Sequence, residues 1–203
     1  MPEPSGVSQR QQQAQWRREQ LLDVAMSVFG TRGLELASTR EVAAAAGVTP
    51  GLLYHYFPSK EALALAVIAE RSLLPELRSL LAATAGQPAA AVIPRFMSEC
   101  AVLVAERAPL FGLFISGATS NPRIRQELHN VIAEGQGLIA GYLTAAVARG
   151  ELRDHDSAAV AHLMIAPVVL GQIVGVPGHA DAIGALLVDH LAQHGTVGDR
   201  PEP

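Results

Sequence analysis

Tyr54, His55 and Lys60 bring a hydroxyl, an imidazole and an ammonium group close together in the stretch YHYFPSK. Each of these groups can donate hydrogen bonds, and the ammonium group is positively charged at neutral pH. Donors of this kind suit phosphate oxygens, and contacts with phosphates fix the position of a protein on a nucleic-acid duplex. The residue types therefore indicate binding to a phosphate backbone.

Two short helices joined by a tight turn are predicted to position these donors. Ser38 and Glu41 have the spacing of a capping box, in which the hydroxyl accepts an early backbone N–H and the carboxylate reaches back to the helix start. Short apolar side chains then recur at helical spacing, and Gly47 falls where a helix needs a left-handed exit. The first helix is therefore expected between Ser38 and Gly47.

The second helix is predicted from Pro50 to about Phe57. Thr49 suits the N-cap, and proline at the first helical position loses no hydrogen bond because its nitrogen has no partner there. Leu53 and Phe57 are four residues apart, so both are expected to face inward against the first helix. Pro58 ends the helix, and the pattern as a whole predicts a helix-turn-helix.

The run TREVAAAAGVTPGLLYHYFPSKEAL resembles the DNA-binding signature of the tetracycline-repressor (TetR/AcrR) family, whose members carry a similar G-V-S-x-x-x-L-Y-x-Y-F-x-S-K-E pattern. The resemblance covers roughly residues 16 to 70. It implies two groups of DNA-binding residues. The positions that touch phosphates in family members are occupied here by Thr39, Tyr54, His55 and Lys60, and the positions that read bases by Arg40, Thr49, Pro50, Gly51 and Leu52.

The base-reading surface implied by this resemblance has few polar groups. Pro50, Gly51 and Leu52 have no side-chain donors, although Pro50 and Leu52 can contact thymine methyl groups. Arg40 is the guanidinium placed to read a guanine, and Thr49 can bond a base or a phosphate. We therefore predict direct readout of few bases per half-site, supplemented by recognition of DNA shape.

The composition predicts an all-α protein. The 203 residues are 49% hydrophobic and only 4% aromatic, alanine is abundant, and alternating β-branched runs are absent. The expected organisation is a three-helix DNA-binding head followed by a helical-bundle body for ligand binding and dimerisation. The predicted ranges are a disordered tail at 1–12, the head at 13–58, the body at 59–195 and a loose tail at 196–203.

The charge is distributed unevenly along the chain. The net charge is −4, but residues 10–60 carry six basic against four acidic side chains, and residues 61–203 carry nine against fourteen. This asymmetry suits a protein that touches DNA at one end. Arg10, Arg17 and Arg18 have two open interpretations, an arm that reaches the DNA backbone or a neighbouring groove, and a solvated charged face.

The body is expected to contain five further helices, at about 89–105, 109–118, 121–149, 157–176 and 180–193. Before them, the helix that begins after Ser59 meets Pro75, which either kinks it or ends it near Leu74. The family resemblance implies that this helix connects the DNA-binding head to the ligand-binding body.

A small-molecule pocket is expected between the helices of the body. Such sites are mostly apolar with a few polar groups on the wall. For each polar candidate, a core or surface role is the competing interpretation. The candidate ligand-binding residues are Phe96, Met97, Cys100, Phe111, Phe114, His129, Tyr142 and His162.

The last two helices are predicted to form a homodimer interface, because residues 158–174 are apolar on every face and the next helix adds further leucines. Two heads related by a two-fold axis would read an inverted repeat in double-stranded DNA. His190 and His194 have i, i+4 spacing, but no cysteine or carboxylate completes a ligand set nearby. We therefore expect no metal and no cofactor.

A membrane span is the alternative for residues 157–176, which approach the necessary length. His162, Pro167, Gln172 and flanking acids argue against it, so a soluble, cytoplasmic protein is expected. The single cysteine, Cys100, cannot form an internal disulfide, and the N-terminus lacks an apolar signal segment.

The function that these features and the family resemblance imply is transcriptional regulation, with a homodimeric repressor released from an inverted-repeat operator by a small apolar ligand. Control by a protein partner and activation in place of repression are alternatives. An enzyme is the least favoured, since the G-x-S-x-G elbow, the H-E-x-x-H motif and a nucleotide-binding loop are missing from the sequence.

Overall fold

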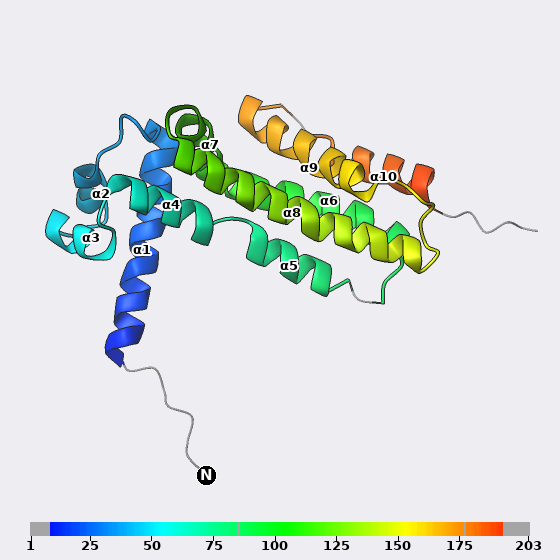
Figure 1. The fold of residues 1–203 in the computed structure, drawn as a ribbon, viewed down its shortest axis with the longest axis horizontal. Coiled ribbons are helices and arrows are strands. Elements are labelled where there is room, and N and C mark those ends of the chain that lie inside the picture. The colour runs from blue at the N-terminus through cyan, green and yellow to red at the C-terminus, as the bar shows by residue number, and fades with distance from the viewer. Residues whose placement is uncertain (1–8, 85, 177, 193–203) are drawn as a thin grey trace, which may run out of the picture. The chain divides into compact units, whose positions relative to one another are not determined.

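A computed structural model describes residues 9–84, 86–176 and 178–192, except for the side chains of Phe114 and Ile115. These residues form ten α-helices, connected in the order shown in Figure 1. The all-α prediction is confirmed. The helices are α1 (Gln9–Arg32), α2 (Thr39–Ala45), α3 (Pro50–Tyr56), α4 (Lys60–Glu70), α5 (Leu74–Ala82), α6 (Ala89–Glu106), α7 (Ala108–Ser120), α8 (Pro122–Ala148), α9 (Ser157–Val174) and α10 (Ala180–Leu191).

Helix α1 begins earlier than the sequence analysis predicts. Residues 9–12 are helical rather than part of a disordered tail, because glutamine and arginine both have high helix propensity and extend the helix by a further turn. Residues 1–8 and the predicted loose tail at 196–203 lie outside the described residues.

Two compact units make up the chain, and they divide it differently from the predicted boundary at residue 58. One unit comprises residues 1–72 and 107–132, and the other comprises residues 73–106 and 133–203. The first unit includes α4 and α7 because their apolar faces share one hydrophobic core with α1, α2 and α3. The largest fully buried side chains of this core are Phe29, Leu21, Leu22, Leu53, Leu63, Ile68, Leu110, Leu113 and Ile124.

In the first unit, α7 crosses α1 at two glycines. A Cβ atom added at Gly30 would collide with the backbone of Pro109, and one added at Gly112 would collide with the carbonyl oxygen of Gly30. The Ser116 hydroxyl of α7 also accepts a hydrogen bond from the Leu34 backbone nitrogen, at 3.0 Å. The close crossing therefore fastens α7 to the helices of the predicted head.

In the second unit, α6 packs against α5, α9 and α10. The side chains of Phe96, Met97 and Cys100 lie in the buried face of α6. Gly184 of α10 allows that helix to approach α6 closely, because a Cβ atom there would lie 2.8 Å from the Pro94 Cα atom.

Pro75 stands in the first turn of α5, not within a kinked helix. The preceding helix α4 ends at Glu70, and α5 begins at Leu74 with the proline at a position that tolerates a missing N–H. Of the two predicted possibilities, the structure therefore shows a helix that ends, and it ends four residues before Leu74.

Among the described residues, α8 and α9 are long and apolar enough to cross a membrane by length and composition. Only 22% of the α9 window is buried inside the single chain. Leu163, Leu170 and Val174 of α9 are each more than half exposed. Helix α9 thus has an apolar surface that the chain itself does not cover.

Candidate nucleic-acid interface

Local hydrogen bonds fix both ends of the α2–α3 hairpin. The Ser38 backbone nitrogen donates to the Glu41 carboxylate at 2.7 Å, and the Glu41 backbone nitrogen donates to the Ser38 hydroxyl at 3.2 Å, which confirms the predicted capping box. Gly47 has the predicted left-handed conformation, with φ +65°. The Thr49 hydroxyl then accepts the backbone N–H of Leu52 at 3.3 Å and caps α3.

The same contacts determine the charge state of Glu41. The backbone hydrogen bond from Ser38, followed by its hydroxyl, lowers the pKa of this carboxyl group, and the neighbouring Arg32 guanidinium acts in the same direction. Arg32 and Glu41 also form an ion pair that links the end of α1 to α2. Glu41 is therefore a structural anion at neutral pH.

Helix α3 has one buried and one exposed face. Leu53 and Phe57 are only 1% and 3% exposed, which confirms that they face the core. Most of the residues that the family resemblance assigns to DNA contact are exposed to solvent, while Thr39 and Lys60 are partly buried. The exposed residues are Arg40, Thr49, Pro50, Gly51, Leu52, Tyr54 and His55.

Thr39 and Tyr54 are brought together across the hairpin. Their hydroxyl oxygens lie 2.9 Å apart, so one donates a hydrogen bond to the other. This contact joins the first turn of α2 to the middle of α3 and holds both hydroxyl groups at one surface. Two of the predicted phosphate-binding residues thus lie side by side.

Lys60 is held by the backbone between α1 and α2. Its ammonium group donates to the carbonyl oxygens of Glu35 and Ala37 at 3.1 and 2.9 Å. An ammonium group has three N–H bonds, so one donor remains for a phosphate. Sequence reasoning missed this structural role, because the loop carbonyls meet the ammonium only after α1, α2 and α4 have packed.

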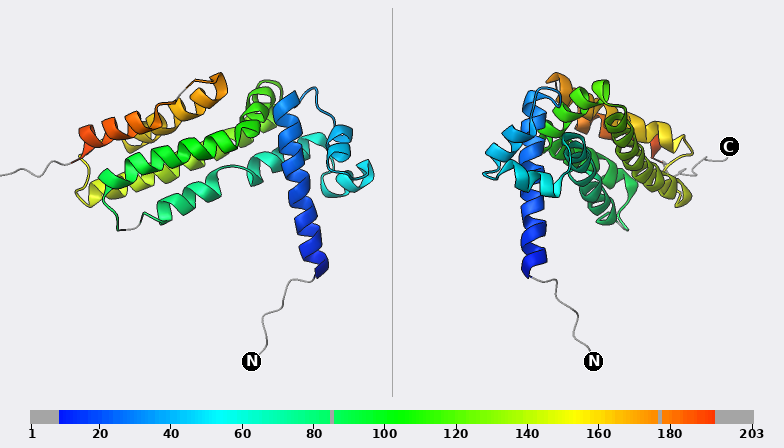
Figure 2. Two further views of the ribbon diagram at one scale, coloured as in Figure 1. Left: turned by 180° about the vertical axis from the view of Figure 1, so that it is seen from behind. Right: turned by 60° about the vertical axis from the view of Figure 1, so that its left-hand side comes forward.

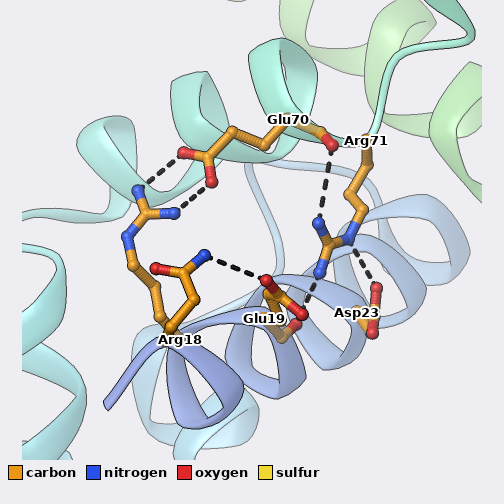
Figure 3. Close-up of polar contacts among 6 residues, drawn as sticks. Arg18, Glu19, Asp23, Glu70 and Arg71 are labelled. Atoms are coloured by element: carbon orange, nitrogen blue, oxygen red, sulfur yellow. Dashed lines mark hydrogen bonds and ion pairs between the residues drawn. The ribbon is translucent and has the colours of Figure 1, made fainter. Parts of the chain in front are cut away.

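An ion-pair cluster, formed by Arg18 and Asp23 of α1 with Glu70 and Arg71 at the end of α4, holds these two helices together (Figure 3). Arg18 makes two hydrogen bonds to the Glu70 carboxylate, which raise the pKa of the guanidinium further. Arg71 donates to Asp23 at 2.6 Å and to the backbone oxygen of Glu19 at 2.9 Å. Arg18 is therefore paired with α4, whereas Arg17 contacts Gln20 and Trp16 of its own helix.

The predicted ligand-binding residues are distributed over both units. Phe96, Met97 and Cys100 form part of the buried α6 face, whereas Phe111 is buried in α7.

His129 is exposed, and the side chain of Phe114 lies outside the described residues. His162 is exposed and bonds Gln136 at 2.8 Å. Tyr142 is half-buried, and its hydroxyl group has no hydrogen-bond partner among the described residues; burial raises the pKa of this group. The eight candidates therefore do not line one described cavity.

A groove of about 660 Å³ lies instead between α5 and α6. Its volume falls within the range of small-molecule sites. The sequence signal for it is weak, because α5 is short and its pairing with α6 depends on tertiary packing. The lining residues include Pro75, Ser79 and Leu80 of α5 and Val102, Leu103 and Glu106 of α6.

Among the described residues, no group of three or more His, Cys, Asp or Glu side chains could hold a metal ion. His190 lies in α10, and His194 lies outside the described residues.

Comparison with known proteins connects the hairpin with a family. A sequence profile for "Bacterial regulatory proteins, tetR family" matches residues 21–67. The chain is 43% identical over 95 residues to the HTH-type transcriptional regulator BetI of Rhizobium meliloti, a match that covers 47% of this chain and 44% of BetI. It is 49% identical over 47 residues to the HTH-type transcriptional repressor KstR2 of Rhodococcus jostii, covering 23% of each chain. The chain thus spans less than half the length of these two relatives.

A solved structure extends the similarity beyond the hairpin. A TetR transcriptional regulator from Chloroflexus aurantiacus superimposes with a TM-score of 0.73 and 27% identity, covering 89% of this chain and 98% of that one. The similarity therefore includes the helical body as well as the head. Residues 21–67 thus match the tetR family of bacterial regulatory proteins, and the fold of a TetR regulator extends over 89% of the chain.

Proposed function

We propose that the protein is a sequence-specific DNA-binding regulator of transcription that places α3 in the major groove. The observation that carries this proposal is the exposed face of α3, which presents Thr49, Leu52 and Tyr54 to solvent while Leu53 and Phe57 anchor the helix in the core. Because the core already holds α3 in place, the helix would enter the groove without first having to become ordered. The regulatory relatives support this role, and a regulator of this kind acts in the cytoplasm and performs no catalysis.

The second part of the proposal is a homodimer that binds an inverted repeat. Leu163, Leu170 and Val174 recur on one face of α9, and Leu186 of α10 is 68% exposed. Uncovered apolar surface of this extent is typical of an interface, and a second copy provides a matching surface by symmetry. A two-fold dimer would present its heads to successive major grooves, about 34–36 Å apart. We prefer this interpretation of α9 to insertion in a membrane.

The third part is control by a small, largely apolar effector that releases the protein from DNA. The α5–α6 groove offers a suitable volume next to the break that contains Arg71, Ser72 and Leu73. An effector that binds the DNA-free arrangement about 1.4 kcal/mol more tightly lowers operator affinity tenfold. The predicted pocket residues of α6, including Phe96 and Met97, lie on the buried face of the helix that forms one side of this groove.

Selection of duplexes from a random pool with the purified protein tests the DNA-binding part. The expected product is an inverted repeat whose binding weakens steeply as salt concentration rises, since phosphate contacts release counterions. Enrichment of single half-sites would contradict the dimer, and absence of any enrichment would contradict the regulator. With the operator in hand, an effector screen that finds operator binding insensitive to every ligand would favour control by a protein partner.

A further inference from the structure

A second groove lies beside the DNA-reading helix, between the N-terminal turns of α1 and the outer face of α3. Its volume is about 630 Å³. Figure 2 shows that α1 continues past the level of α3, so its first turns lie outside the three-helix core. The side chains that line this groove include Arg10, Gln13, Trp16 and Arg17 from α1 and Leu52 and Tyr56 from α3.

The α1 side of the groove is strongly basic. The sequence from Gln9 to Arg18 is QRQQQAQWRR, which contains three arginines and no acid. Arg10 and Arg17 are seven residues apart and therefore lie on the same side of the helix. Arg10, in the first turn of α1, opposes the helix dipole, although arginine has a high intrinsic helix propensity.

The polar groups of this surface suit a sugar-phosphate backbone. Guanidinium groups bind phosphate oxygens through two parallel N–H bonds, and the Gln13 amide can add a further donor. Trp16 is 55% exposed, and the Arg17 guanidinium lies 5.2 Å from the centre of its ring. The indole offers an apolar face for a sugar next to its own N–H donor.

Unlike Arg10 and Arg17, Arg18 is not among the residues that line the groove. It faces α4, where it is paired with the carboxylate of Glu70. Arg10 and Arg17 instead line the groove that Leu52 shares, and Leu52 belongs to the exposed DNA-facing side of α3. A duplex that contacts Leu52 would therefore lie next to Arg10 and Arg17.

We propose that the N-terminal turns of α1 form a second DNA-binding site, in which Arg10 and Arg17 bind phosphates just outside the half-site read by α3. This inference rests on the proposed DNA-binding function and adds a contact that depends on the length of the duplex and not on its flanking sequence. Each protomer would thus hold about two additional phosphates, one for each guanidinium.

Duplexes of two lengths test the proposal, one ending at the selected operator and one carrying arbitrary flanking base pairs on both sides. The wild-type protein should bind the longer duplex more tightly. The double variant Arg10→Gln/Arg17→Gln should bind both with equal affinity. Its slope of log affinity against log salt should be smaller by roughly 2 per protomer, at 0.9 for each lost phosphate. Between 50 and 200 mM salt, the advantage of the longer duplex should fall about tenfold per protomer in the wild type.

A matched control is Arg125→Gln/Arg153→Gln, which removes the same charge from exposed positions of α8 and of the segment after it. This variant should retain the advantage of the longer duplex. Neutral methylphosphonates at the flanking phosphates should weaken wild-type binding and leave the α1 variant unaffected. The proposal is overturned if Arg10→Gln/Arg17→Gln keeps the full advantage of the longer duplex, or if the wild type has none. Failure of the wild type to bind either duplex would instead overturn the proposed function.

Discussion

The hydroxyl groups of Thr39 and Tyr54 lie 2.9 Å apart and connect the first turn of α2 to α3. Through this hydrogen bond, the two helices present their hydroxyl groups at one surface as a unit. If these hydroxyl groups bind phosphate, as we propose, this contact couples the geometry of the hairpin to DNA binding.

Tyr54→Phe should reduce operator affinity by about tenfold, because it removes a hydroxyl that either bonds a phosphate directly or positions Thr39 to do so. The free energy of unfolding should fall by only about 0.5–1 kcal/mol, since the ring is retained and the hydrogen bond is exposed. Titration of the operator and urea denaturation measure the two quantities. A variant with unchanged operator affinity would show that the Tyr54 hydroxyl neither binds a phosphate nor positions Thr39 to do so.

The α2 capping box should make the stability of the head depend on pH. Hydrogen bonds from Ser38 hold the pKa of Glu41 below its usual value. A depressed carboxyl pKa contributes stability that is fully present above the unfolded-state pKa, near 4.3, and is lost as pH falls through the folded-state value. Glu41→Gln should lower the melting temperature at pH 7 and have little effect at pH 3.

Ser38→Ala is the companion variant for the capping box. Loss of the N-cap hydroxyl should cost about 1 kcal/mol at neutral pH. Thermal melts of both variants between pH 3 and pH 7 check these expectations. A Glu41→Gln protein that melts in parallel with the wild type at every pH would rule out the ionised carboxylate as the stabilising group.

Cys100 should be unreactive in the folded protein. Burial in α6, together with the negative charge of Glu99, raises the pKa of its thiol to about 12. Because the thiolate is the reactive form, a disulfide reagent at pH 8 should label the native protein many-fold more slowly than the urea-unfolded protein. Equal labelling rates would contradict the packing of α6.

Leu163→Asp/Leu170→Asp should convert the proposed dimer into a monomer, because it places two charges on the exposed apolar face of α9. Light scattering reports the mass, and operator titration should show that affinity for the inverted repeat falls at least tenfold. Ile132→Asp, at a position that is 47% exposed on α8, provides a control that should remain dimeric. A monomeric wild-type protein would contradict the proposed interface.

The α2–α3 hairpin could be predicted from the sequence because its determinants are local. Ser38, Glu41, Gly47 and Thr49 each act within three or four residues along the chain, so their caps and turns can be recognised without the tertiary structure. The division of α3 into a buried and an exposed face follows from the four-residue spacing of Leu53 and Phe57, one of them the last residue before the helix-ending proline.

Long-range contacts could not be predicted in the same way. Arg18 pairs with Glu70, which is 52 residues away in the sequence, and Lys60 donates to the carbonyl oxygen of Glu35. Both contacts form because α1 packs against α4. The aromatic and sulfur-containing side chains of α6 likewise pack in the core. Helical spacing predicts that this face is buried, but it does not distinguish a face covered by protein from a face covered by a ligand. For that reason, the α5–α6 groove was absent from the sequence analysis.

The central claim, that the exposed face of α3 enters DNA, is tested most directly at Gly51. Gly51 lies in the first turn of α3, and a Cβ atom added there would meet no atom within 4 Å. Gly51→Glu should preserve the fold, because an acid is favourable near a helix N-terminus, and it should abolish operator binding by placing a carboxylate against the duplex. The matched variant Gly51→Ala should keep its affinity within a few-fold of the wild type. Retention of operator binding by folded Gly51→Glu would contradict the account.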